Sequence, residues 1–132
     1  MTSLDQTAPA ILVVDDDSLL RGLAVDVLRS EGYRAAGVEG AAEALLLLQP
    51  NSELSLLITD INMPGMNGLE LVDAVAASLP DLKVLVMSGR ERLEATQLPH
   101  TVQFLQKPFS AKALLERVGL MMAVRPTFGA AS

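Results

Sequence analysis

The sequence contains no cysteine and few aromatic residues, and both absences restrict what the protein can be. Without cysteine the chain has neither disulfide bonds nor a thiol nucleophile, which suits a reducing compartment. Aromatic residues make up 3% of the chain, so the core must consist of aliphatic side chains and methionine, a composition that favours helices packed on a sheet. Hydrophobic residues make up 50% of the 132 positions, which excludes a disordered chain and indicates one folded domain.

Basic residues and long apolar runs are also scarce. The chain has 10 Lys and Arg against 16 Asp and Glu, and its net charge of −6 disfavours a surface that follows the phosphates of a nucleic acid. The longest unbroken apolar runs, such as Ala44 to Leu48, are far too short to cross a bilayer. Residues 1–9 lack the charged and then apolar pattern of a signal peptide. We therefore expect a soluble cytoplasmic protein that binds neither nucleic acid nor membrane.

Short apolar runs typical of buried strands alternate along the chain with segments of helical periodicity. The alternation predicts an α/β fold, in which right-handed crossovers join a parallel sheet covered by helices on both faces. Residues 1–9 and 124–132 are expected to be a loose leader and a loose tail around a domain of residues 10–123. The expected strands are 10–14, 33–38, 54–60, 82–87 and 102–106, and the expected helices begin near residues 18, 41, 69, 90 and 110.

Two of the expected helices carry specific signals. Asp17 or Ser18 is placed to cap the first helix, and Gly32 is placed to end it. The four leucines at 45–48 in the second helix cannot all face one side, because successive helical residues point about 100° apart. Some of these leucines should be exposed or covered by a partner. The inner face of the first helix is predicted to carry Leu20, Leu23, Ala24, Val27 and Leu28.

Polar side chains follow four of the expected strands at the point where each strand ends. They are Asp15 and Asp16 after the first strand, Asp60 after the third, Ser88 after the fourth and Lys107 after the fifth. The carboxyl ends of parallel strands meet at one edge of the sheet, where ligands bind in open α/β folds. We therefore expect these five side chains to converge on one pocket.

Three carboxylates in one pocket raise one another's pKa unless a cation lies among them. Mg²⁺ fits best, because it binds carboxylate oxygens, keeps water ligands and leaves room for a phosphoryl group. Lys107 adds a movable positive charge and Ser88 a hydroxyl donor, which are groups that hold phosphoryl oxygens, and an Asp carboxylate can accept phosphate covalently. Simpler interpretations stay open for each residue taken alone: acids that cap a helix, a solvated lysine and an ordinary turn serine.

One combined pattern is formed by four segments at these strand ends: Val13–Asp16, Ile58–Gly68, Val86–Gly89 and Phe104–Phe109. In order and spacing they resemble the receiver domains of two-component response regulators. The resemblance covers about residues 10–123 and implies a flavodoxin-like, three-layer fold with five helices and a five-stranded parallel sheet in the order 2-1-3-4-5. Between Ser88 and Lys107 the chain is a few residues shorter than is usual in the family, which predicts a short or irregular fourth helix.

The resemblance also implies the roles of individual residues. Asp60 would accept a phosphoryl group from a phosphohistidine on a sensor histidine kinase or a histidine phosphotransfer protein. Asp16, Asp60 and the backbone carbonyl of Asn62 would bind Mg²⁺ directly, while Asp15 would act mainly through water. Lys107 would pair with the phosphoryl group. The protein would then catalyse only its own phosphorylation and dephosphorylation.

By the same resemblance, Ser88 would turn inward to bond the phosphoryl group and Phe104 would rotate with it, which would switch an interaction surface for a downstream protein. Taken alone, Phe104 is equally well explained as a core residue. Pro108 predicts a fixed backbone after Lys107, with a cis peptide bond. The sequence does not decide between a stand-alone receiver and one attached to a hybrid histidine kinase, nor between a monomer and a homodimer.

Two other functions use the same residues. A Mg²⁺-dependent phosphohydrolase of the haloacid-dehalogenase type would use Asp60 as a nucleophile, but it needs a general acid two residues later, where Asn62 stands. An interaction module with a vestigial pocket would not need the acids, the serine and the lysine together. Both alternatives are less favoured than a phosphorylated receiver.

Overall fold

The computed structural model describes residues 10–49, 52–61, 65, 67–89 and 102–123. Within them, one parallel sheet has the strand order β2-β1-β3-β4-β5, which confirms the order that the sequence predicts. The predicted leader, the predicted tail and the predicted fourth helix near residue 90 lie outside the described residues. The strands are β1 (Ile11–Val14), β2 (Ala35–Val38), β3 (Leu56–Asp60), β4 (Lys83–Ser88) and β5 (Val102–Gln106).

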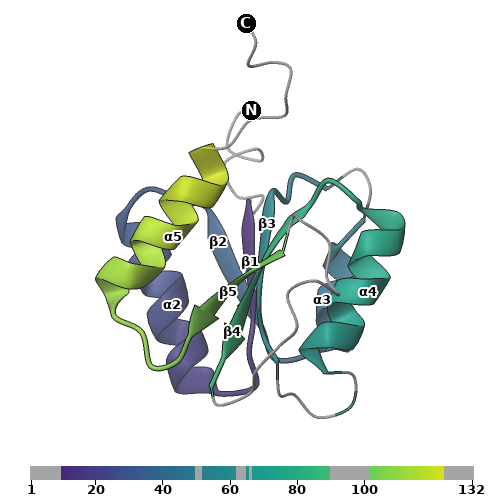
Figure 1. The fold of residues 1–132 in the computed structure, drawn as a ribbon, viewed down its shortest axis with the longest axis horizontal. Coiled ribbons are helices and arrows are strands. Elements are labelled where there is room, and N and C mark those ends of the chain that lie inside the picture. Colours follow the sequence, from purple (N-terminus) through teal and green to yellow (C-terminus); the bar gives the residue numbers. More distant parts are fainter. Residues whose placement is uncertain (1–9, 50–51, 62–64, 66, 90–101, 124–132) are drawn as a thin grey trace, which may run out of the picture.

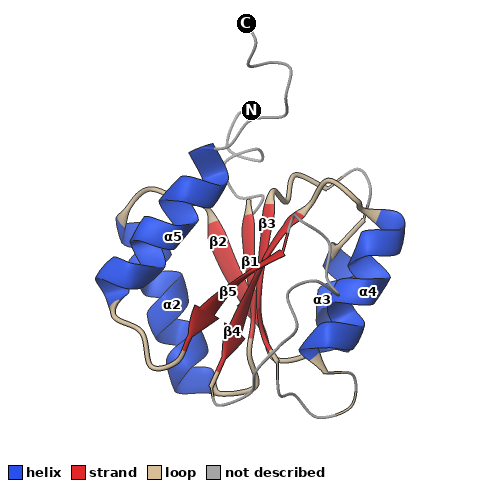
Figure 2. Ribbon diagram, viewed as in Figure 1, coloured by secondary structure: helices blue, strands red, loops and turns tan. Residues whose placement is uncertain are grey.

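Four described helices cover the sheet in two layers (Figure 1). Helices α2 (Ser18–Ser30) and α5 (Ala111–Ala123) lie on one face, and α3 (Ala41–Leu47) and α4 (Gly68–Ser78) lie on the other (Figure 2). The three layers are those of the predicted α/β fold. Each helix begins within a residue of the predicted position, but α3 ends at Leu47, two residues earlier than expected.

The core is divided by the sheet into two apolar clusters. Successive residues of a strand point to opposite faces. Ile11 and Val13 of β1 pack under α2 and α5, whereas Leu12 and Val14 pack under α3 and α4, and all four side chains are fully buried. Burial on both faces explains why β1 and β3 are apolar runs without alternation.

The helices confirm some of the predicted details and correct one. Asp17 caps α2, since its Oδ1 accepts hydrogen bonds of 3.0 and 3.1 Å from the backbone N–H groups of Leu19 and Leu20. The predicted inward position of Leu23 is wrong, because this side chain is 54% exposed and Val25 is buried instead. The buried stripe of α2 therefore runs through Ala24, Val25 and Leu28.

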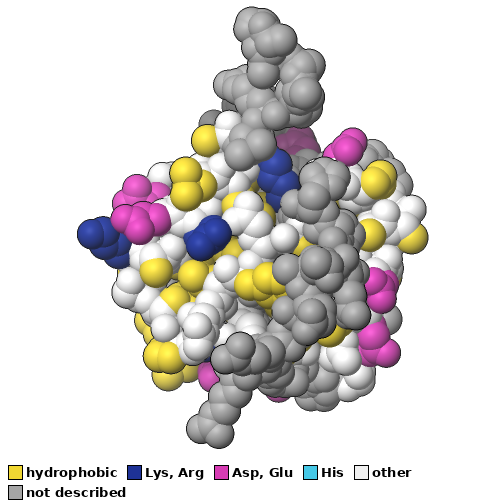
Figure 3. Space-filling view, in the orientation of Figure 1, with side chains coloured by type: hydrophobic (Ala, Val, Ile, Leu, Met, Phe, Trp, Pro, Cys, Tyr) yellow, Lys and Arg dark blue, Asp and Glu magenta, His cyan; other side chains and the backbone are white. Residues whose placement is uncertain are grey.

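The leucine run of α3 is divided between core and surface, as helical geometry predicts. Leu48 is buried, Leu45 packs partly against the core, and Leu46 and Leu47 are 76% and 42% exposed. In the coloured part of the face shown in Figure 3, apolar side chains form small patches separated by the backbone and other side chains, with a few charged groups between them. None of the described helices has the length and hydropathy needed to cross a membrane.

Candidate functional site

The carboxyl ends of four strands meet at one edge of the sheet, and polar residues stand at each of them. Asp15 follows β1, Asp60 ends β3, Ser88 ends β4 and Lys107 follows β5. The arrowheads of β4 and β5 mark this edge at the bottom of Figure 2. The backbone N–H of Lys107 donates a 2.7 Å hydrogen bond to the carbonyl oxygen of Ser88, so the last two strand ends are tied together.

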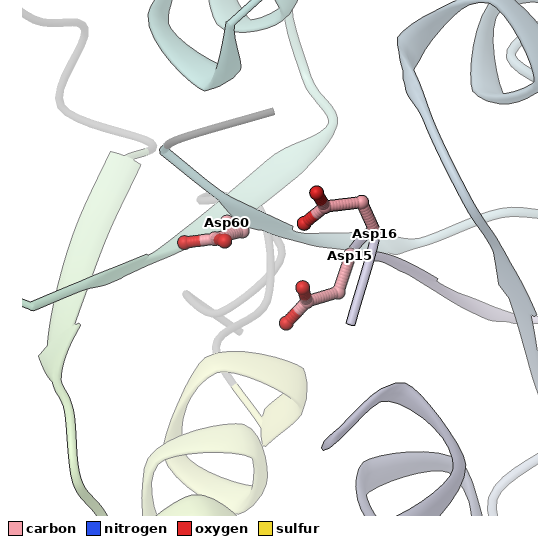
Figure 4. Close-up of side chains that lie close together, drawn as sticks. All are labelled: Asp15, Asp16 and Asp60. Carbon is pink, nitrogen blue, oxygen red and sulfur yellow. The ribbon is translucent and has the colours of Figure 1, made fainter. Parts of the chain in front are cut away.

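Three carboxylates form the centre of the site. Asp15 and Asp16 leave the end of β1 beside Asp60 of the adjacent strand β3 (Figure 4), and one carboxylate oxygen of each lies within 4.8 Å of the others. Asp15 is completely buried and Asp60 nearly so, whereas Asp16 is exposed. Two carboxylates of the cluster are therefore buried, and the third is open to solvent.

Lys107 supplies the positive charge that faces this cluster. Its Nζ lies 3.1 Å from Asp60 Oδ1 and 3.7 Å from Asp15 Oδ2. The lysine side chain is 24% exposed, so it keeps some contact with solvent while its amine pairs with the two acids. The peptide bond between Lys107 and Pro108 is cis, as predicted.

Asp15 is the most constrained of the acids. Burial raises the pKa of its carboxyl group, although the backbone N–H of Asp17 and the charge of Lys107 oppose that shift and the neighbouring acids add to it. Its Oδ1 accepts a 3.0 Å hydrogen bond from the Asp17 N–H. Its Oδ2 is buried and has no hydrogen-bond partner among the described residues.

A divalent cation fits this arrangement. One buried oxygen of Asp15 has no hydrogen bond, and the three carboxylates have ligand atoms within 4.8 Å of one another. Together they offer hard oxygen donors of the type that binds Mg²⁺. Asp15, Asp16 and Asp60 are the described residues able to hold such an ion. The backbone carbonyl of Asn62, which the sequence analysis adds to this set, lies outside the described residues.

Asp60 is fixed by its own strand end and by the start of α4. Its Oδ1 accepts a 2.8 Å hydrogen bond from the Ile61 N–H, and the Thr59 hydroxyl donates a 2.9 Å hydrogen bond to its carbonyl oxygen. Gly68 begins α4 directly against this turn. A Cβ at position 68 would overlap the Asp60 carbonyl oxygen and lie 2.8 Å from Ile61 Cα.

Gly68 is a positioning residue that the sequence analysis quotes within a motif without assigning it a role. The N–H of Gly68 donates a 2.9 Å hydrogen bond to the carbonyl oxygen of Ile61, so the absence of a side chain lets two backbones touch. A glycine at the first position of a helix that follows a strand end is the sequence signal for such a contact.

The two residues predicted to switch lie close to the pocket. Ser88 is buried at the end of β4, and Phe104 of β5 packs partly buried against the apolar cluster under α3 and α4. Phe104 pairs directly with Val86, which lies two residues before Ser88 on β4. All three side chains therefore lie on the same face of the sheet, because strand residues alternate between faces.

Comparison with known proteins identifies the family. A family model described as a response regulator receiver domain matches residues 11–119, which is most of the chain. The chain belongs to this family. Its receiver domain is 38% identical to a response regulator receiver protein from Pseudomonas putida, whose crystal structure matches with a TM-score of 0.76 over 86% of this chain and 97% of that one.

Two curated relatives show how the receiver domain compares in length. The response regulator protein FleR of Pseudomonas aeruginosa is 36% identical over 84% of this chain, but the chain spans only 24% of FleR. The response regulator receiver protein CpdR of Brucella abortus is 32% identical over 85% of this chain, and the match covers 95% of CpdR. Similar receivers thus occur as nearly whole proteins and as parts of longer ones.

Replacing Gly68 by alanine should lower the free energy of unfolding by roughly 1–3 kcal/mol, because the new Cβ must displace the backbone that holds Asp60. Gly22→Ala is the matched control, since Gly22 lies in α2 with nothing near its Cβ position and should gain about 0.5–1 kcal/mol from the better helix former. Urea unfolding measures both. Equal effects of the two substitutions would contradict the close contact at Gly68.

Mg²⁺ should stabilise the wild-type protein by about 2.7 kcal/mol at a concentration 100 times the Kd, since it binds only the folded pocket. Asp15→Asn should raise the stability of the metal-free protein by roughly 1 kcal/mol, because it removes a buried charge, and should weaken the response to Mg²⁺. Thermal unfolding with EDTA and with MgCl₂ measures both effects. A wild-type melting temperature that does not respond to Mg²⁺ would argue against the metal site.

Proposed function

We propose that this receiver domain is a phosphorylation-dependent signalling protein, in which Asp60 accepts a phosphoryl group from a phosphohistidine of a sensor histidine kinase or a histidine phosphotransfer protein. One observation carries the proposal: the Asp60 carboxylate lies 3.1 Å from the Lys107 amine and within 4.8 Å of two further carboxylates. One pocket thus offers a carboxylate nucleophile, a positively charged hydrogen-bond donor and a candidate metal site. Phosphoryl transfer needs mainly such positioning and charge stabilisation.

The reaction follows from this arrangement. A carboxylate oxygen of Asp60 forms a bond to phosphorus while the bond between phosphorus and the histidine nitrogen breaks, and the electron pair of that bond stays on the imidazole. Asp15, Asp16 and Asp60 would hold Mg²⁺, which when bound supplies positive charge to the phosphoryl oxygens. The metal is the proposed cofactor of both phosphorylation and dephosphorylation.

Lys107 has to change partners during this reaction. In the structure its amine forms ion pairs with Asp60 and Asp15. After the transfer, the phosphoryl oxygens carry more negative charge than either carboxylate. Its unbranched, partly exposed side chain lets the amine move to a phosphoryl oxygen while it stays in the pocket. The Ser88 hydroxyl, at the end of the neighbouring strand, would donate a hydrogen bond to the same group.

The proposed output is a switched protein–protein interaction surface. Ser88, Val86 and Phe104 share one face of the sheet, so an inward turn of Ser88 changes the space next to Phe104. A phosphoryl group that bonds Ser88 in only one arrangement shifts the population toward that arrangement. The downstream partner is a protein, and the receiver itself turns over no separate substrate in this proposal.

Incubation with Mg²⁺ and acetyl phosphate should add one phosphoryl group to the wild-type protein, detected by intact mass, and EDTA should prevent the addition. Asp60→Asn should abolish it, because an amide is not a phosphoryl acceptor. Asp26→Asn is the matched control on an exposed position of α2 and should be modified like the wild type. Modification that survives Asp60→Asn would refute the assignment, and sustained hydrolysis of a small phosphomonoester would indicate a phosphohydrolase instead.

A further inference from the structure

Arg21, at the end of the first turn of α2, makes a contact that none of the roles above uses. Its side chain turns back to the end of β1, where Nη1 donates a 2.7 Å hydrogen bond to the backbone carbonyl oxygen of Asp15. No salt bridge among the described residues involves Arg21. The guanidinium charge is therefore directed at a peptide group, and such charge-assisted hydrogen bonds are roughly twice as strong as neutral ones.

The path of the Arg21 side chain depends on a glycine in the neighbouring strand. A Cβ at Gly37 of β2 would lie 2.8 Å from Arg21 Cγ and 3.0 Å from Cδ. Both distances are too short for carbon atoms, whose optimal separation is about 3.5–4.0 Å. Gly37 pairs with Val13 in β1, so the arginine stem lies against β2 next to the strand that leads to Asp15. Glycine at position 37 leaves the space that the stem fills.

The hydrogen bond acts on two acids at once. The carbonyl group of Asp15 belongs to the peptide bond that joins Asp15 to Asp16. Because a peptide unit is planar, an anchor on its oxygen restrains the orientation of the unit and the positions of the Cα atoms on both sides. One contact from Arg21 therefore restrains the starting points of two of the three carboxylates in the pocket.

The remaining contacts of Asp15 complete this restraint. Its N–H donates a 3.2 Å hydrogen bond to the Val38 carbonyl oxygen, and its Oδ1 accepts from the Asp17 N–H. With the carbonyl oxygen held by Arg21, the polar groups of Asp15 other than Oδ2 all have a hydrogen-bond partner. Oδ2 is the atom left over, and it faces Lys107 at 3.7 Å.

We propose that Arg21 is a positioning residue for the cation site: through the carbonyl oxygen of Asp15 it fixes the peptide unit between Asp15 and Asp16, and thereby directs both carboxylates at one Mg²⁺. The inference rests on the proposed function, because it requires these acids to bind the metal. Groups that orient metal ligands in this way typically change metal affinity 10- to 100-fold when removed.

The direction in which Mg²⁺ affinity changes when Arg21 is removed distinguishes a positioning role from a purely electrostatic one. If Arg21 acted only as a positive charge near the acids, its removal would strengthen the binding of a divalent cation. If it positions the acids, its removal weakens the binding. Arg29 provides the matched control: it lies on the same helix, and its Nε donates a 2.9 Å hydrogen bond to the Ala35 carbonyl oxygen in β2, away from the acids.

The test is the Mg²⁺ dissociation constant of the whole chain, measured by calorimetry for Arg21→Met and Arg29→Met. Methionine keeps an unbranched apolar stem in both places and removes the donor. We expect Arg21→Met to weaken Mg²⁺ binding at least tenfold and Arg29→Met to change it less than threefold. Arg21→Lys, which keeps a charge and a donor on a shorter side chain, should recover part of the loss.

A second readout needs no metal. In the metal-free protein, hydrogen exchange at the Asp17 amide, which donates to Asp15 Oδ1, should be at least tenfold faster in Arg21→Met than in Arg29→Met. If Arg21→Met does not fold, the same measurements are made on Gly37→Ala. The new Cβ displaces the arginine stem, so this variant should also bind Mg²⁺ more weakly.

Two results would overturn the inference about Arg21 and leave the proposed function unaffected. One is a wild-type protein that binds Mg²⁺ together with an Arg21→Met variant that binds it equally or more tightly. The other is an equal loss of affinity in Arg21→Met and Arg29→Met. A wild-type protein that binds no Mg²⁺ would instead overturn the proposed function, and this inference with it.

Discussion

The ion pair between Lys107 and Asp60 is the interaction on which the rest of the site depends. The carboxylates of Asp15, Asp16 and Asp60 lie within 4.8 Å of one another and two of them are buried, so a nearby positive charge offsets their mutual repulsion. The lysine amine supplies that charge from the last strand end, 3.1 Å from Asp60 and 3.7 Å from Asp15. In the proposed reaction the amine would leave the carboxylates for the phosphoryl group while it stays in the pocket.

The strand order makes this ion pair possible. Asp15 and Asp60 come together because β1 and β3 are neighbours in the sheet, although more than forty residues separate them in the sequence. The placement of β4 beside β3, and of β5 beside β4, then brings Ser88 and Lys107 to the same edge. Two apolar clusters hold these strands from both faces, so the polar residues at their ends stand on a rigid support.

Much of this arrangement is predictable from the sequence, since its causes are local. The apolar run that ends at Asp60 and the cap at Asp17 are decided by neighbouring residues, and the structure confirms both. Leu23 shows the limit: helical periodicity allows it on the inner face, but the packing of α2 against the sheet selects Val25 instead. Gly68 contacts the backbone of Asp60 and Ile61 across a turn, and Arg21 reaches the backbone of Asp15 with a side chain that folds back. Periodicity and spacing do not reveal such contacts.

The central claim is that Lys107 and Mg²⁺ would share the same carboxylates, and that the lysine amine would then move with the charge onto the transferred phosphoryl group. The most direct measurement compares Mg²⁺ affinity and the rate of phosphorylation by acetyl phosphate in Lys107→Met, with exposed Lys112→Met as the control. The account predicts that Lys107→Met binds Mg²⁺ at least as tightly as the wild type but is phosphorylated roughly 100-fold more slowly. An unchanged rate at saturating Mg²⁺, or a loss of Mg²⁺ affinity, would contradict it.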